Sequence, residues 1–185
     1  MINDALKESD KKMGYSLDHL REELGKLRTG RASIAILEGL KLDYYGTPTP
    51  LNQVATLGTP DSHTLSIQPW DQSILKDIEK LILTSDLGLT PNNDGKLIRL
   101  GIPPLTRERR EQLVKLVKKR AEECKVAMRN IRRDFNDKVK AAEKNHEISE
   151  DESRKVQDEM QKITDQHIKE VDELSHTKEK DVLET

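Results

Sequence analysis

Residues 106–145 read TRERREQLVKLVKKRAEECKVAMRNIRRDFNDKVKAAEKN and contain neither proline nor glycine. Apolar side chains recur in this segment at steps of three or four positions, the spacing of one buried stripe on an α-helix. Thr106 is suited to cap the first turn. We therefore predict one long helix from Thr106 to about Asn145. Its buried stripe comprises Leu113, Val117, Ala121, Cys124, Met128, Ile131, Phe135, Val139 and Ala142.

Two further segments carry a stripe of the same kind. Residues 1–29 contain no proline, and their apolar positions alternate by four and three from Met13 through Leu17, Leu20, Leu24 and Leu27. After a predicted turn at 145–148, Ser149 and Glu152 match a capping box and open a third helix. Because helices with so little apolar surface are marginal alone, we predict that the three pack around one thin core. The third stripe comprises Val156, Met160, Ile163, His167, Val171 and Leu174.

The segment between the first two helices has a different character, since it holds all seven prolines and most of the nine glycines. Alternating apolar residues predict short strands at 40–45, 55–57, 64–68 and 96–100, and residues 72–84 predict an amphipathic helix. Proline restrains its predecessor and lacks an N–H group, so 46–50 should form a turn or an extended loop. Residues 87–95 are expected to be turn-rich.

These patterns indicate an α+β protein with an elongated three-helix bundle and a small inserted β/α/β domain. We assign residues 1–30 and 105–185 to the bundle and residues 31–104 to the insertion. The first and second helices can pack only if the inserted chain leaves and returns at nearly the same place. Two adjacent connecting segments, near Gly30 and Pro103–Pro104, therefore make a hinge plausible.

The composition limits the kind of protein further. The apolar fraction is 34% and the charged fraction is 36%, a balance that suits long helices better than a thick spherical core. The single cysteine, Cys124, excludes an internal disulfide and is expected in the helical core. The N-terminus lacks a secretory signal, and no apolar run approaches the roughly twenty residues of a membrane helix. We expect a cytoplasmic protein that does not enter a membrane.

The net charge of −2 conceals two oppositely charged helices. Residues 106–145 hold fourteen basic and seven acidic residues, a net of +7, whereas residues 149–185 hold six basic and twelve acidic residues, a net of −6. In one interpretation the two helices simply neutralise each other, although surface ion pairs contribute little, about 0–1 kcal/mol each. In the other interpretation, the basic helix binds a polyanion.

A stripe of cations on the basic helix favours the second interpretation. Lys125, Arg129 and Arg132 are spaced four and three apart, with Arg133 beside them. Guanidinium groups present planar forks that match phosphate oxygens. Further cations end the first helix, where Arg28 and Arg31 flank Gly30. Aromatic residues do not interleave these positions, so contact with the phosphates and shape of structured RNA fits better than base stacking.

The motifs of the common enzymes are missing from the sequence. There is no phosphate-binding loop of the G-x-x-x-x-G-K-[ST] type, no dinucleotide fingerprint and no cysteine pair for zinc. The five histidines do not have the spacing of a metal site. We therefore predict a binding protein with no catalytic residues, no metal and no cofactor.

Six segments form a recognisable set in order along the chain: KLRTGRAS (26–33), YYGTPTPL (44–51), SDLGL (85–89) followed by Pro91-Asn92, IPPLT (102–106), ERR (108–110) and RNIRRD (129–134). Together they resemble the ribosome recycling factor family over the whole length. One departure is Arg107, where the family more often has an acidic residue after the threonine.

The resemblance implies an L-shaped monomer the size of a tRNA, whose helical bundle and β/α/β domain meet at a flexible hinge. It implies binding along large-subunit rRNA after termination and, with elongation factor G and GTP, separation of the subunits with release of mRNA and tRNA. Arg132 is the best candidate for an essential rRNA contact, with Arg129, Arg133, Arg28, Arg31 and Lys125 as further candidates. The hinge would comprise Gly30, Pro103, Pro104, Leu105 and Thr106.

A competing hypothesis is a structural or chaperone-like coiled-coil protein that binds only other proteins. The heptad periodicity alone permits it. It does not account for the cluster of Arg129, Arg132 and Arg133 or for the six matched segments.

Overall fold

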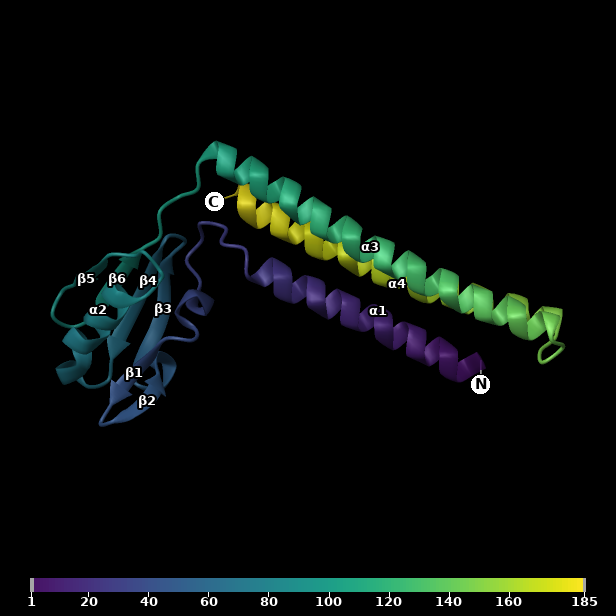
Figure 1. Cartoon of the computed structure of the whole chain (residues 1–185). Coiled ribbons are helices and arrows are strands. Elements are labelled where there is room, and N and C mark those ends of the chain that lie inside the picture. The colour runs from purple at the N-terminus through teal and green to yellow at the C-terminus, as the bar shows by residue number, and fades with distance from the viewer. Residues whose placement is uncertain (1, 185) are drawn as a thin grey trace. The chain divides into compact units, whose positions relative to one another are not determined.

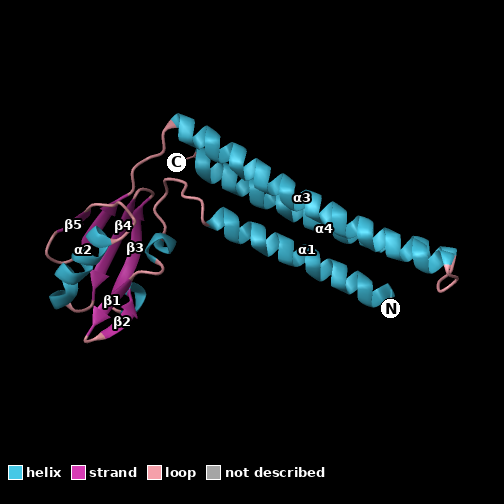
Figure 2. Cartoon of the chain, in the orientation of Figure 1, coloured by secondary structure: helices cyan, strands magenta, loops and turns pink. Residues whose placement is uncertain are grey.

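The computed structural model describes residues 2–184 and divides into two compact units (Figure 1). One unit is formed by the chain up to Arg28 together with the chain from Arg107 onward, and the other by Thr29–Thr106. The first unit is entirely helical, and the second holds all the strands of the described residues (Figure 2). The α+β class and the insertion of the small unit between two long helices are as predicted.

The helical unit is a bundle of α1 (Ile2–Gly25), α3 (Arg107–Lys144) and α4 (Glu150–Leu183), in which each helix packs against the other two. α1 and α4 run in one direction and α3 in the other (Figure 1). With 38 residues, α3 is about 57 Å long at 1.5 Å per residue. None of the helices in residues 2–184 has both the length and the apolar character needed to cross a membrane.

The bundle core follows the predicted stripes. Met13, Val117, Met128, Met160 and Val171 are completely buried, and Phe135 is 2% exposed. Cys124 is buried in the same cluster, as predicted. Ile131, Ile163 and Leu174 are only partly buried and lie at the edge of the core.

Polar side chains interrupt the α4 stripe at positions that the pattern did not reveal. Ser153, Thr164 and Ser175 are buried. The hydroxyl of Thr164 donates to the backbone oxygen of Met160 at 2.7 Å, so the helix itself satisfies it. His167, predicted on the seam, is largely buried and lies 2.7 Å through Nε2 from Asp10 Oδ1, which ties α4 to α1.

The end of α1 differs from the prediction, whereas the start of α4 confirms it. We predicted that the first helix would continue to residue 29, but α1 ends at Gly25. Glycine has the poorest helix propensity after proline, and near a helix end packing does not compensate for it. At the start of α4 the capping box is complete: Glu152 N donates to Ser149 Oγ at 3.2 Å, and Ser149 N donates to Glu152 Oε2 at 2.9 Å.

The β-containing unit has two antiparallel sheets and one α-helix, α2 (Leu75–Thr84), entered through a 3₁₀ turn at Gln72–Ile74. One sheet is the β1–β2 hairpin, and the other has the order β3-β4-β6-β5. Short 3₁₀ helices at Ile34–Leu37 and Leu51–Gln53 complete the unit. The strands are β1 (Lys41–Tyr44), β2 (Thr47–Pro50), β3 (Ala55–Asp61), β4 (Thr64–Pro69), β5 (Pro91–Asn93) and β6 (Ile98–Gly101).

Two segments predicted as turns or loops pair as strands instead. Residues 46–50 contribute β2, in which Pro48 lies opposite Asp43 and Pro50 opposite Lys41. The strand tolerates both prolines because it pairs on one side only, and the alternate residues Thr47 and Thr49 keep their N–H groups. Residues 87–95 contain β5, another edge strand, and β3 extends four residues beyond the predicted Leu57.

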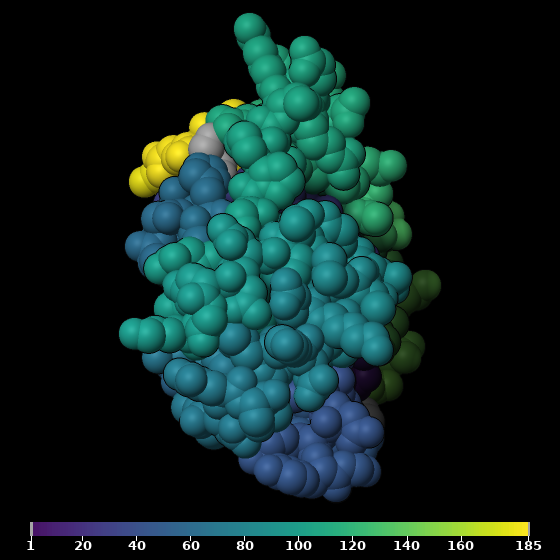
Figure 3. All heavy atoms as spheres, turned by 90° about the vertical axis from the view of Figure 1, so that its left-hand side faces the viewer, coloured from purple at the N-terminus to yellow at the C-terminus, as the bar shows by residue number. Residues whose placement is uncertain are grey.

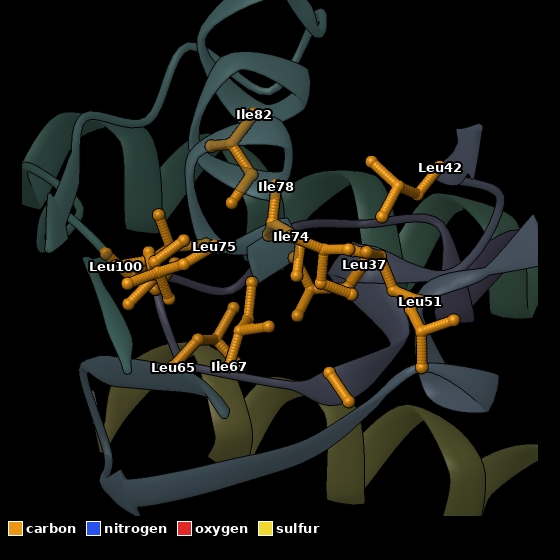
Figure 4. Packing of buried hydrophobic residues seen from close by; sticks show 14 residues of the cluster. Leu37, Leu42, Leu51, Leu65, Ile67, Ile74, Leu75, Ile78, Ile82 and Leu100 are labelled. Carbon is orange, nitrogen blue, oxygen red and sulfur yellow. The ribbon is translucent and has the colours of Figure 1, made fainter. Parts of the chain in front are cut away.

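One face of α2 packs on the four-stranded sheet and forms a second core. Ile78 and Ile82 point from the helix toward the strand residues Leu65 and Ile67 (Figure 4). Together with Ile98 and Leu100 of β6, these residues are almost completely buried. Figure 3 shows the unit from the side of α2, where α2 and its neighbouring segments (teal) form most of the surface. The unit therefore has a core of its own.

The turn between β3 and β4 binds both connecting segments of this unit. On the incoming side, Ala32 N donates to the backbone oxygen of Ser62 at 2.7 Å, and His63 Nδ1 donates to the backbone oxygen of Gly30 at 3.2 Å. On the outgoing side, Ile102 N donates to the backbone oxygen of His63 at 2.7 Å. The chain thus enters and leaves the unit on either side of one turn, as the packing of α1 against α3 requires.

Candidate nucleic-acid interface

The cations of α3 lie at increasing angles from its buried stripe. At 3.6 residues per turn, Lys125 and Arg132 lie at the edge that faces α4, while Arg129 and Arg133 point further outward. Lys125 and Arg132 are partly exposed, and Arg129 and Arg133 are exposed. The four side chains thus form one stripe, in which each cation has a different environment.

Lys125 is engaged by carboxylates on both sides. Its Nζ lies 2.8 Å from Asp172 Oδ1 on α4 and 3.6 Å from Glu122 Oε2 on α3, and the side chain is 21% exposed. The hydrogen bond to Asp172 is the main reason why the pKa of Lys125 is raised. Its charge is already paired, so we expect Lys125 to tie α3 to α4 more than to attract a phosphate.

Arg129 is paired with a carboxylate of its own helix. Its Nη2 donates to Glu122 Oε1, about two helical turns before it. The hydrogen bond from Arg129 is also the largest cause of the lowered pKa of the Glu122 carboxyl. Both side chains remain exposed to solvent, so a phosphate could replace Glu122 as the partner of Arg129.

Arg132 has a neutral partner instead. Its Nη1 donates to Gln161 Oε1 on α4 at 2.8 Å, and Gln161 Nε2 donates to Asp165 Oδ1 at 2.7 Å. A guanidinium has five N–H donors, so one bond to Gln161 leaves most of them for another acceptor. Lys125 and Arg129 are paired with carboxylates, whereas the partner of Arg132 carries no charge.

Arg28 and Arg31 are both exposed but belong to different units of the structure. Arg28 lies beyond the end of α1, and Glu23, near that end, pairs with Arg120 of α3 at 3.5 Å. Arg132 is 12 residues beyond Arg120, about 18 Å further along the α3 axis. Arg28 and Arg132 therefore cannot bind the same phosphate, and an RNA that contacts both must follow the bundle.

The predicted hinge residues surround the boundary between the two units. Gly30 is buried with φ 77°, a backbone conformation that favours glycine over any residue with a side chain. Pro103, Pro104 and Leu105 have no regular secondary structure, and α3 begins directly after Thr106. A hinge at these residues stays a prediction.

Sequence reasoning missed the acidic and amide partners of the stripe. Gln161 and Asp165 are four residues apart on α4, so they share a helical face, but the sequence alone does not place that face opposite Arg132. The two interpretations of the charged helices also prove compatible. Pairs such as Lys118 with Glu179, at 3.8 Å, join α3 to α4, while Arg133 remains exposed.

Residues 2–184 contain no cluster of three or more His, Cys, Asp or Glu side chains arranged to hold a metal ion.

Comparison with known families gives a direct match. The model of the family described as ribosome recycling factor matches residues 20–183. The chain belongs to the ribosome recycling factor family. The six sequence segments therefore identified the family correctly.

Similar proteins match this member of the family over its full length. The ribosome-recycling factor of Desulfatibacillum aliphaticivorans is 54% identical over 184 residues, covering 100% of both chains. That of Syntrophomonas wolfei subsp. wolfei is 52% identical with the same coverage. A solution structure of a ribosome recycling factor is similar with a TM-score of 0.77 and 38% identity, covering 100% of this chain and 98% of the other.

A second solved structure adds a functional setting. It contains models of the ribosome recycling factor of T. thermophilus and of elongation factor G of E. coli, bound to the E. coli post-termination complex. The matched chain is 48% identical, with a TM-score of 0.65, and the match covers 99% of each chain. A similar protein thus occurs together with elongation factor G on a post-termination complex.

Proposed function

We propose that this chain binds the ribosome after termination and, with elongation factor G and GTP, promotes separation of the subunits and release of mRNA and tRNA. The full-length similarity to a factor bound to the post-termination complex carries this proposal. The basic stripe of α3 supports it, because ribosomal RNA is the polyanion that such a stripe would contact.

In this proposal the helical bundle docks through phosphate contacts along large-subunit rRNA. Arg132 makes the central contact, Arg129 exchanges Glu122 for a phosphate, and Arg133 contributes an exposed charge. The bundle suits such a role because one core joins its three long helices along their length. Contact with phosphates and helix shape, rather than base stacking, fits a surface without aromatic residues among its arginines.

The β-containing unit would transmit the action of the GTPase. Its two connecting segments are held together by the turn at Ser62–His63, so the unit would move as one body about residues 29–30 and 103–106. The chain needs no catalytic group of its own for this role, because GTP hydrolysis by elongation factor G supplies the free energy. The protein would act in the cytoplasm as a monomer, its three apolar stripes buried against one another.

Light scattering of post-termination ribosomes tests the proposal. We expect scattering to fall, as ribosomes separate into smaller particles, only when this protein, a matched elongation factor G and GTP are all present. Omission of any one component serves as the control. If scattering stays constant with all three, although the protein binds ribosomes and shows its full helical signal, recycling is not its activity. Binding to ribosomal proteins alone would instead favour the protein-only hypothesis.

A further inference from the structure

The contact of Arg132 with α4 is a directed chain of two hydrogen bonds. Arg132 Nη1 donates to Gln161 Oε1 at 2.8 Å, and Gln161 Nε2 donates to Asp165 Oδ1 at 2.7 Å. Gln161 and Asp165 are exposed, and neither is part of the bundle core. Burial of apolar surface therefore does not explain why these side chains adopt this arrangement.

The partners fix the orientation of the Gln161 amide. An ionised carboxylate only accepts hydrogen bonds, and a guanidinium only donates them. The amide must therefore turn its NH₂ group toward Asp165 and its oxygen toward Arg132. Asp165 thus holds Gln161 in the one orientation that can accept from Arg132.

The chemical nature of the partner separates Arg132 from Arg129. Glu122 holds Arg129 with a carboxylate, which orients the guanidinium but also neutralises its charge. An amide oxygen orients a guanidinium without cancelling its charge. The unit charge of Asp165 is one side chain further away, where solvent screens it. Arg132 is therefore both positioned and fully cationic.

We propose that Gln161, oriented by Asp165, is a positioning residue that holds the Arg132 guanidinium ready for an rRNA phosphate while leaving its charge available. This inference rests on the proposed function, because it assigns Arg132 the central phosphate contact. Gln161 itself need not touch the RNA. Its contribution is to reduce the conformational entropy that Arg132 loses on binding.

Two substitutions of Gln161 separate orientation from charge. Gln161→Ala removes the acceptor and should weaken binding to isolated large ribosomal subunits about two- to tenfold, the effect of ordering one long side chain at the interface. Its salt dependence should stay unchanged. Gln161→Glu keeps an acceptor but adds a negative charge next to Arg132. It should weaken binding as well and reduce the slope of log K against log salt by about 1.

Gln166 provides the matched control on the same helix. It is exposed on α4, five residues beyond Gln161. Gln166→Ala and Gln166→Glu should leave affinity and slope within error of the unsubstituted protein. If Gln166→Glu lowers the slope as much as Gln161→Glu, general charge repulsion explains the result and the positioning role is overturned.

The double variant with Arg132→Ala decides whether Gln161 acts through Arg132. In the Arg132→Ala background, Gln161→Ala should cause no further loss of affinity. In that background and in the unsubstituted protein alike, Gln161→Ala should leave the thermal unfolding midpoint unchanged. Additive losses would mean that Gln161 acts independently, which contradicts the proposal. If Arg132→Ala weakens binding and Gln161→Ala does not, the positioning role alone fails. If the unsubstituted protein does not bind ribosomal subunits, the proposed function fails first.

Discussion

Arg132→Ala should weaken binding to the large ribosomal subunit by about 1–3 kcal/mol, the usual range for loss of a charge-assisted hydrogen bond. This corresponds to an increase in Kd of about 5- to 150-fold. Arg132 lies at the edge of the bundle with a single neutral partner, so its removal leaves no buried group unpaired. The thermal unfolding midpoint should therefore change little. Equilibrium binding measured over a series of salt concentrations checks both the affinity and the number of phosphate contacts.

Arg154→Ala is the matched control for this substitution. Arg154 is an exposed arginine of the same bundle and forms an ion pair with Glu150 within α4. Its removal lowers the net charge of the protein equally, so it reveals any effect of overall charge on association. Arg154→Ala should leave Kd nearly unchanged, whereas Arg132→Ala should also reduce the salt slope by about 1. Equal effects of the two substitutions would exclude a specific contact by Arg132.

Phe135→Ala should lower the free energy of unfolding of the bundle by about 3–5 kcal/mol, as expected for removal of a buried aromatic side chain. Phe135 is the only phenylalanine of the chain and is 2% exposed. Each helix contributes a single stripe of side chains to the core. Few neighbouring side chains can therefore move into the cavity that the substitution leaves. Urea denaturation followed by the helical circular dichroism signal should show a lower midpoint with an unchanged slope.

Val126→Ala provides the comparison for Phe135→Ala. Val126 lies on the same helix but is 44% exposed, on the side opposite the core. Its substitution should change the free energy of unfolding by less than about 0.5 kcal/mol. If Phe135→Ala cost as little, the stripe of α3 would not be the main source of bundle stability. The β-containing unit has its own core, which contains none of the bundle residues. The urea midpoint followed by the fluorescence of Trp70, in that unit, should therefore be the same in Phe135→Ala as in the unsubstituted protein.

The heptad stripes made the bundle predictable, because a helix with one apolar face has few ways to bury it. The capping box at Ser149 and Glu152 was equally clear, since it depends only on residues three apart. The edge strands were harder. β2 contains Pro48 and Pro50, and proline has a low propensity for β-strands. Only the pairing with β1 shows that their missing N–H groups are tolerated.

The candidate site was predictable in its cations but not in their partners. Spacing alone placed Lys125, Arg129 and Arg132 on one side of a helix. Their different environments depend on the register between α3 and α4, which brings Gln161 next to Arg132 and Asp172 next to Lys125. Register between helices arises from packing of the whole bundle, so no local sequence signal specifies it.

The insertion between α1 and α3 has a consequence for vectorial synthesis. α1 packs only on helices that begin at Arg107 and Glu150, and at 5–20 residues per second about 4–16 s pass between the end of α1 and the start of α3. The β-containing unit needs no residue outside 29–106 for its core, so we expect it to fold first. In nascent chains stalled within α3, a protease should cleave α1 and spare this unit. α1 would thus remain without its partner helices during synthesis of the β-containing unit, and the bundle would close only once α4 has been made.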